Sequence, residues 1–159
     1  KGRKRTRQKD GSVLLTVQAG EDWDDLVAHT VQAGLQGLES LSGIPGTVGA
    51  SVIQNIGAYG YEISDVLDGI EFLDYADREQ KTLTQDELGL GHRTSDLKTG
   101  DRQGVVLAVT FRVHPSNKSR PIAYGQVADA LGVELGDTAP LATLRETLLS
   151  LRRSKGMVV

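Results

Sequence analysis

Residues 43–60 restrict the folding of this chain more than any other segment, because five glycines stand among the eighteen residues GIPGTVGASVIQNIGAYG. A glycine inside a helix or strand costs about 0.5–1 kcal/mol relative to alanine, so we expect neither a regular helix nor a regular strand here. Five aliphatic residues interrupt the glycines and predict a backbone held by a hydrophobic core: Ile44, Val48, Val52, Ile53 and Ile56. A fixed glycine-rich backbone lets main-chain N–H groups approach a ligand, usually an anionic or hydrogen-bonding one.

The glycine spacing excludes two common nucleotide-binding loops. It matches neither G-x-G-x-x-G after a strand nor G-x-x-x-x-G-K-[ST]. Taken alone, the segment also fits a set of tight turns that join a helix to a sheet. Its function therefore has to be judged together with the other motifs of the chain.

Composition places the chain among ordinary globular proteins. Its 159 residues, 38% hydrophobic and 25% charged, fit one domain or one domain with part of a second. The net charge of −3 argues against a nucleic-acid partner, and we predict neither a transmembrane helix nor a signal peptide. The lack of cysteine excludes disulfides and thiolate zinc sites, so we predict no metal site and a cytoplasmic location.

The first nine residues are strongly basic, with lysine or arginine at positions 1, 3, 4, 5, 7 and 9. Two interpretations compete, a contact with nucleic acid and a solvated connection that ends in a turn at Asp10 and Gly11. No aromatic residue is interleaved with the charges and the rest of the chain is acidic. We therefore predict the connection.

The hydrophobic pattern predicts an α+β fold with a mainly antiparallel sheet flanked by helices. We expect strands at residues 13–17, 66–75, 81–84 and 104–113, a helix that begins near Glu21 and stops before Gly34, and a helix at residues 140–155. Trp23 falls on the apolar face of the first helix, so we expect a core residue. In the last strand Val105, Leu107, Val109, Phe111 and Val113 alternate with other residues and predict one wholly apolar face.

Three short clusters carry candidate functional side chains: GHRTS at residues 91–95, AYG at 123–125 and LRRSK at 151–155. An arginine such as Arg93 gives a carboxylate two parallel hydrogen bonds and a fixed charge. The ring of Tyr124 suits the covering of a sugar or nucleotide, and the cations near residue 155 suit a diphosphate. Each cluster also has a structural interpretation, as a surface arginine, a loop tyrosine and the basic end of a helix.

In this order the glycine segment and the three clusters resemble the UDP-N-acetylenolpyruvoylglucosamine reductase family over nearly the whole chain from residue 13 onward. The resemblance implies FAD and NADPH as cofactors. It also implies the second half of an FAD-binding domain of the vanillyl-alcohol-oxidase type at residues 1–139 and the first helix of a substrate domain at residues 140–159. The implied cofactor-site residues are Ile44, Pro45, Gly46, Gly49, Ser51, Gln54, Asn55, Ile56 and Gly57.

The activity implied by the resemblance is the reduction of UDP-N-acetylglucosamine enolpyruvate to UDP-N-acetylmuramate in peptidoglycan synthesis. Arg93 matches the arginine of a G-Y-R-x-S motif, which lies against the enolpyruvyl carboxylate as a catalytic residue. The implied substrate-binding residues are Tyr59, Tyr124, Arg152 and Lys155. His92 stands where the family has tyrosine, and Gln126 stands where it has an acidic residue.

Two parts of the family pattern are missing from these 159 residues, a G-S-N loop near the start and a G-S-F-F segment with the proton-donor serine. We therefore expect an internal piece of a longer protein, inactive by itself. Two alternatives stay open, another FAD oxidoreductase of the same fold and a non-catalytic nucleotide-binding or assembly module. The oligomeric state is not predicted.

Overall fold

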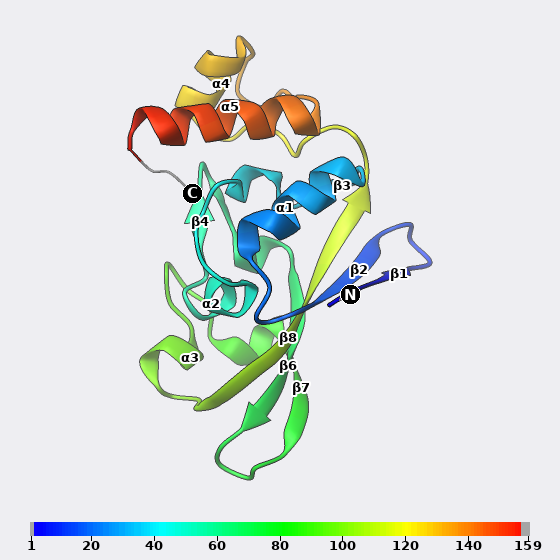
Figure 1. Ribbon diagram of the computed structural model, residues 1–159, viewed down its shortest axis with the longest axis vertical. Helices are drawn as coiled ribbons and strands as arrows, with labels where there is room; N and C mark the ends of the chain where they lie inside the picture. The colour runs from blue at the N-terminus through cyan, green and yellow to red at the C-terminus, as the bar shows by residue number, and fades with distance from the viewer. Residues whose placement is uncertain (1, 157–159) are drawn as a thin grey trace.

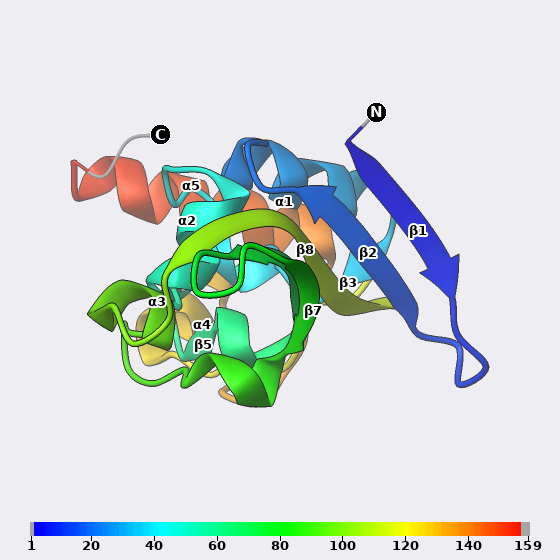
Figure 2. The same ribbon diagram turned by 90° about the horizontal axis from the view of Figure 1, so that it is seen from below.

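One long strand, β8 (Gly104–Pro115), organises the sheet of the protein. The computed structural model describes residues 2–156, and β8 crosses the molecule in both views (Figures 1 and 2). The strand order is β1-β2-β8-β6-β7, with β3 paired to the end of β8, and every pairing is antiparallel. The other strands of this sheet are β1 (Arg3–Arg7), β2 (Val13–Gln18), β3 (Leu35–Gln36), β6 (Leu67–Asp74) and β7 (Gln80–Thr84). These findings confirm the α+β class and place the predicted strands within two residues of the observed ones.

A bulge in β8 reverses which residues face the core. Ala108 pairs with residue 71 of β6 and Val106 pairs with residue 72, so Leu107 is an extra residue between consecutive pairs. Beyond the bulge, Val106 packs against the core, whereas Val105 is 40% exposed. The prediction that Val105 and Leu107 continue the buried face of Val109 was therefore wrong.

The helices lie on one side of the sheet and at one end of the molecule (Figure 1). They are α1 (Trp23–Gln32), α2 (Val48–Ile53), α3 (Asp96–Thr99), α4 (Gly125–Leu131) and α5 (Leu141–Ser154), with single turns of 3₁₀ helix at η1 (Glu39–Leu41), η2 (Ile63–Asp65) and η3 (Gln85–Leu88). Helix α1 begins where the Asp22 carboxylate accepts a hydrogen bond from the Asp25 N–H. Helix α5 begins one residue after the predicted start, and Pro140 precedes it as the cap. None of the described helices is long and apolar enough to span a membrane.

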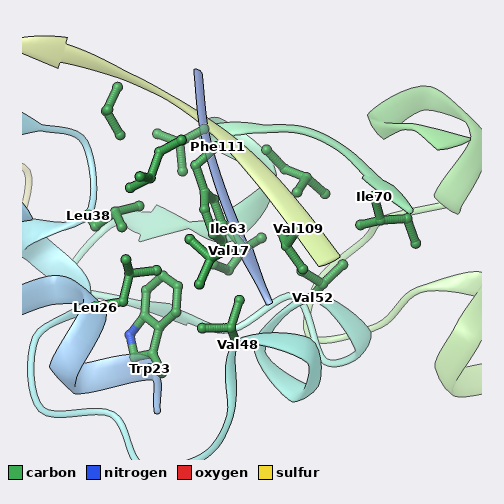
Figure 3. Packing of buried hydrophobic residues seen from close by; sticks show 14 of the residues in the cluster. Val17, Trp23, Leu26, Leu38, Val48, Val52, Ile63, Ile70, Val109 and Phe111 are labelled. Carbon is green, nitrogen blue, oxygen red and sulfur yellow. The ribbon is translucent and has the colours of Figure 1, made fainter. Parts of the chain in front are cut away.

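Trp23 anchors the main core between α1 and the sheet, as predicted (Figure 3). Its side chain is fully buried, its indole N–H donates to the Leu41 carbonyl at 2.9 Å, and its ring meets Phe111 edge-on at 5.7 Å between centroids. Val48 and Val52 of α2 are fully buried in the same cluster. The core therefore fixes the glycine segment against the sheet, because α2 lies in the middle of that segment.

Residues 3–7 of the basic N-terminal segment form strand β1, so the prediction of a simple connection was wrong, although the strand is largely exposed, as the solvated interpretation expected. Arg3 through Arg7 pair in register with β2, and the turn expected at Asp10 and Gly11 joins the two strands. Arg3 also forms an ion pair with Glu21 at 2.8 Å. Charged residues suit an edge strand because they oppose pairing with other chains.

A second hydrophobic cluster joins α4 to α5 and lies apart from the main core. Val127 and Ala128 of α4 pack against Leu144 and Leu148 of α5, and Ile122 completes the contact. Helix α4 was not expected from the sequence. The predicted boundary between residues 139 and 140 falls inside this cluster, and it stays a prediction.

Candidate functional site

The glycine segment contains more regular structure than its composition suggests. Helix α2 includes Gly49, and the hairpin β4 (Gly57–Ala58) and β5 (Tyr61–Glu62) follows it. A Cβ atom at Gly49 would lie 3.0 Å from the Ala19 Cβ, and the Gly49 N–H donates to the Ala19 carbonyl. The expectation of no helix was wrong because close contact with Ala19, the residue after β2, rather than flexibility, requires a glycine at this position.

A groove of about 710 Å³ opens between this hairpin, the loop that carries Arg93 and the ends of α4 and α5. Nine of the fourteen predicted site residues line it: Ile44, Gln54, Ile56, Gly57, Tyr59, Arg93, Tyr124, Arg152 and Lys155. They come from five separate stretches of the chain. The fold therefore gathers the glycine segment and all three shorter clusters at one place.

The groove is cationic. Its lining holds the three cations Arg93, Arg152 and Lys155 and one carboxylate, that of Glu62. The Arg152 Nε donates to the Gly43 carbonyl at 3.2 Å, and the Lys155 Nζ donates to the Gln126 side chain at 2.8 Å. Both contacts are to neutral groups, and among residues 2–156 none of the three cations forms an ion pair, so the groove suits an anionic ligand.

Arg93 stands at a tight turn with an unusual backbone. Gly91 and Thr94 exchange two backbone hydrogen bonds, and Arg93 between them has φ = 54°, in the left-handed region. Its carbonyl accepts a hydrogen bond from the Lys98 Nζ at 2.9 Å. Within residues 2–156 the Arg93 guanidinium forms no hydrogen bond or ion pair. Strained backbone of this kind is concentrated at functional sites, and the exposed guanidinium is available to a ligand.

Gly57 lies directly beside Arg93. A Cβ at Gly57 would come within 3.0 Å of the Tyr61 carbonyl and 3.1 Å of the Glu62 side chain, and it would lie 3.7 Å from the Arg93 Nε. The close approach of the partner strand β5 therefore requires glycine at residue 57. Gly57 also lines the groove, so the hairpin backbone forms part of the wall next to Arg93.

Asn55 is buried behind the groove wall instead of lining it. Its side-chain nitrogen donates to the Glu62 carboxylate at 2.6 Å and to the Gly91 carbonyl at 2.7 Å. Its side-chain oxygen accepts from the Ser64 N–H at 3.0 Å, and its φ is 45°. The amide is therefore engaged inside the protein, and its role at a cofactor site stays a prediction.

The four other predicted cofactor residues also lie outside the groove lining. Pro45 and Gly46 are exposed on the loop before α2. Gly49 and Ser51 are buried in α2, and the Ser51 hydroxyl donates to the Val48 carbonyl. The two buried residues shape the segment from within.

Tyr59 and Tyr124 form one end of the groove. Their rings meet edge-on at 5.5 Å between centroids, and Tyr124 is 44% exposed. Gly60 permits the approach, because a Cβ there would lie 2.9 Å from the Ala123 Cβ. The hairpin tip and the segment before α4 are thus joined by a contact between two aromatic rings that line the groove.

A buried arginine ties the same hairpin to the Tyr124 segment. The Arg120 guanidinium lies 3.9 Å above the Tyr61 ring, and the backbone N–H of Arg120 donates to the buried Glu39 carboxylate at 2.8 Å. Burial raises the pKa of the Tyr61 phenol, and its hydroxyl donates to the Pro121 carbonyl. Sequence reasoning missed Arg120, Glu39 and Tyr61, because no local motif brings together residues so far apart in the chain.

Helix α5 is fixed to the start of the glycine segment by Asp24. Both carboxylate oxygens of Asp24 accept from Arg145, at 2.8 and 2.9 Å, and one also accepts from the Gly43 N–H at 2.6 Å. Burial acts to raise the pKa of Asp24, but the hydrogen bonds and the charges of Arg145 and Arg152 outweigh it and hold this pKa below its usual value. The pair therefore stays charged at neutral pH.

Comparison with known proteins agrees with this geometry. Residues 3–84 match the FAD binding domain family. The chain is 51% identical to UDP-N-acetylenolpyruvoylglucosamine reductase of Leifsonia xyli, over 100% of this chain and 44% of that protein. The same-named protein of Saccharopolyspora erythraea is 48% identical, over 94% and 41%. The crystal structure of UDP-N-acetylenolpyruvylglucosamine reductase (MurB) from Thermus caldophilus has a TM-score of 0.61 at 27% identity and covers 89% of this chain and 42% of that one.

The chain spans less than half the length of these relatives. The family match itself covers more than half of the 159 residues and includes the whole glycine segment. The chain therefore belongs to the FAD binding domain family, and within it the chain resembles the MurB-type reductases.

Proposed function

We propose that this chain is part of a cytoplasmic, NADPH-dependent flavoenzyme that reduces the enolpyruvyl double bond of UDP-N-acetylglucosamine enolpyruvate, giving UDP-N-acetylmuramate for peptidoglycan. The observation that carries the proposal is the exposed Arg93 guanidinium, which has no partner among residues 2–156 and lies beside Gly57 in a groove that also holds Arg152 and Lys155. The identity to reductases across the full chain supports the same assignment.

The glycine segment would form the flavin side of the groove. FAD, when bound, would carry the hydride from NADPH to the substrate. Ile44, Gln54, Ile56 and Gly57 line this side and would contact the ring. Exposed Pro45 and Gly46 would border the cofactor, while buried Gly49 and Ser51 would shape the segment behind it.

Arg93 would bind the carboxylate of the enolpyruvyl group. When hydride adds to the conjugated double bond, negative charge spreads onto that carboxylate as an enolate. A fixed guanidinium stabilises this charge more in the transition state than in the ground state, and so lowers the barrier. The left-handed turn and the Lys98 contact to the Arg93 carbonyl would hold the backbone of Arg93 in place before the substrate arrives.

The other end of the groove would bind the nucleotide sugar. Arg152 and Lys155 would pair with the diphosphate, and Tyr59 with Tyr124 would cover the substrate. We propose that α5, which carries Arg152 and has Lys155 as its C-cap, begins the substrate domain.

Anaerobic stopped-flow absorbance of the full-length protein tests this function. The bound flavin is first reduced with one equivalent of NADPH and then mixed with UDP-N-acetylglucosamine enolpyruvate. We expect fast recovery of the oxidised flavin band, slowed by about 10²–10³ in Arg93→Ala, the size typical for loss of one electrostatic stabiliser.

The matched control is Arg78→Ala, because Arg78 is also an exposed arginine with positive φ but lies in the turn between β6 and β7. It should leave the recovery unchanged. A flavin that stays reduced after mixing would assign another substrate, and a protein without flavin would refute the flavoenzyme.

A further inference from the structure

We propose that Asn55 is a positioning residue that holds the Arg93 turn at the groove, an inference that rests on the proposed function. The hydrogen bond from Asn55 to the Gly91 carbonyl joins the glycine segment to the Arg93 turn, and the two residues are 36 positions apart in the sequence. No part of Asn55 lines the groove. Its effect on a ligand therefore has to pass through its neighbours.

The Asn55 amide has little capacity left for a ligand. A primary amide offers two N–H donors, and both find acceptors, one on Glu62 and one on Gly91. Its oxygen accepts from Ser64, at the start of the chain segment that leads into β6. The residue is fully buried, so a ligand could reach the amide only after these bonds break.

The three bonds set the spacing between two walls of the groove. Glu62 belongs to the hairpin whose first strand contains Gly57, and Gly91 begins the turn that presents Arg93. One planar amide joins both, so the distance from the Gly57 backbone to the Arg93 guanidinium depends on it. A second tether, from the Ser95 hydroxyl to the Ile53 carbonyl at 2.6 Å, fixes the far side of the turn.

The backbone of Asn55 explains why this amide stands at this position. Its φ of 45° is left-handed, a conformation that asparagine adopts more readily than other residues apart from glycine. Asn55, Tyr59 and Arg93 are three of the four non-glycine residues with positive φ among the described residues, and all three lie at or behind the groove wall. Glycine at residue 55 would keep the backbone and remove only the amide.

The test is Asn55→Gly in the full-length flavin-bound protein, with Arg78→Gly as the matched control at the fourth left-handed position. Stopped-flow absorbance measures flavin reduction by NADPH and recovery by the enolpyruvyl substrate separately. We expect recovery to slow by about 10²-fold, as for a misplaced catalytic group, and reduction to change by less than threefold. Arg78→Gly should change neither rate.

Two further measurements separate positioning from general loss of structure. Hydrogen exchange should rise in the peptide that spans residues 89–99 and stay unchanged in β2 and β8. The double variant Asn55→Gly with Arg93→Ala should recover no more slowly than Arg93→Ala alone, because the amide acts through the arginine.

Equal slowing of both half-reactions with loss of flavin would overturn the proposal, as would fully additive effects in the double variant. Unchanged exchange at residues 89–99 would overturn it independently of activity. If Arg93→Ala recovers at the normal rate, the proposed function fails instead, and the exchange measurement still decides whether Asn55 holds the turn.

Discussion

Gly49 and Gly125 each stand in a helix, yet their surroundings impose opposite requirements. A Cβ at Gly49 would meet the Ala19 side chain at 3.0 Å and its carbonyl at 3.3 Å, whereas a Cβ at Gly125 would meet nothing within 4 Å. Neither residue has positive φ. The glycine at residue 49 is therefore explained by its close contact with Ala19 rather than by a backbone conformation that only glycine can adopt.

We expect Gly49→Ala to destabilise the protein by about 1–3 kcal/mol, the usual cost of overpacking, because backbone atoms at Ala19 cannot move aside easily. Gly125→Ala should stabilise it by up to about 1 kcal/mol, because alanine favours a helix and limits the unfolded chain. Urea unfolding of both variants measures the two free energies. A higher unfolding midpoint for Gly49→Ala would contradict the close contact seen here.

Helix α5 is held by an ion pair with α1 that the sequence of α5 alone does not predict. Asp24 fits the acidic first turn of α1, but the structure uses it as the partner of Arg145, 121 residues away. The same carboxylate accepts from Gly43. One side chain therefore holds α1, α5 and the start of the glycine segment together.

Arg145→Met should cost about 1.5–3 kcal/mol at neutral pH, the range for hydrogen bonds to a charged group. The folded pKa of Asp24 lies below the unfolded value, so its contribution is complete above the unfolded pKa and is lost as the pH falls through the folded pKa. The destabilisation should therefore shrink on acidification below about pH 4.

Urea unfolding at several pH values measures the free energy of unfolding of this variant. The control is Arg153→Met, an exposed arginine on the same helix, which should change stability by less than about 0.5 kcal/mol. A cost for Arg145→Met that does not depend on pH would contradict the ion pair.

The elements that the sequence predicted well are those with strong local signals. Runs of β-branched and other apolar residues located β2, β6, β7 and β8, and the leucine stripe located α5. The bulge at Leu107, strand β1 and helix α4 were missed, because each depends on a partner elsewhere in the fold. In the candidate site, motif order found nine groove residues, while the burial of Asn55 depends on contacts with Glu62, Ser64 and Gly91 that no spacing reveals.

At the scale of the whole molecule, the charge of the groove is opposite to that of the chain. The net charge is −3, but the groove lining holds three cationic side chains and one carboxylate. The main core holds the glycine segment, which forms one wall of the groove. The second cluster holds α5, and Arg152 and Lys155 lie at the end of this helix. Docking of the two clusters therefore creates a local positive site that would concentrate an anionic substrate.

UDP binding to the full-length protein tests this local field. Lys155→Met should weaken the affinity about tenfold, because a hydrogen bond to a charged group contributes about 1.5–3 kcal/mol and part of it is lost to screening by water and salt. Arg153→Met removes the same charge two residues away, outside the groove lining, and should change the affinity less than twofold. Isothermal titration calorimetry at low and high salt measures both variants, and the gap between them should narrow as the salt concentration rises. Equal losses for the two variants would mean that overall charge, and not a diphosphate contact in the groove, governs binding.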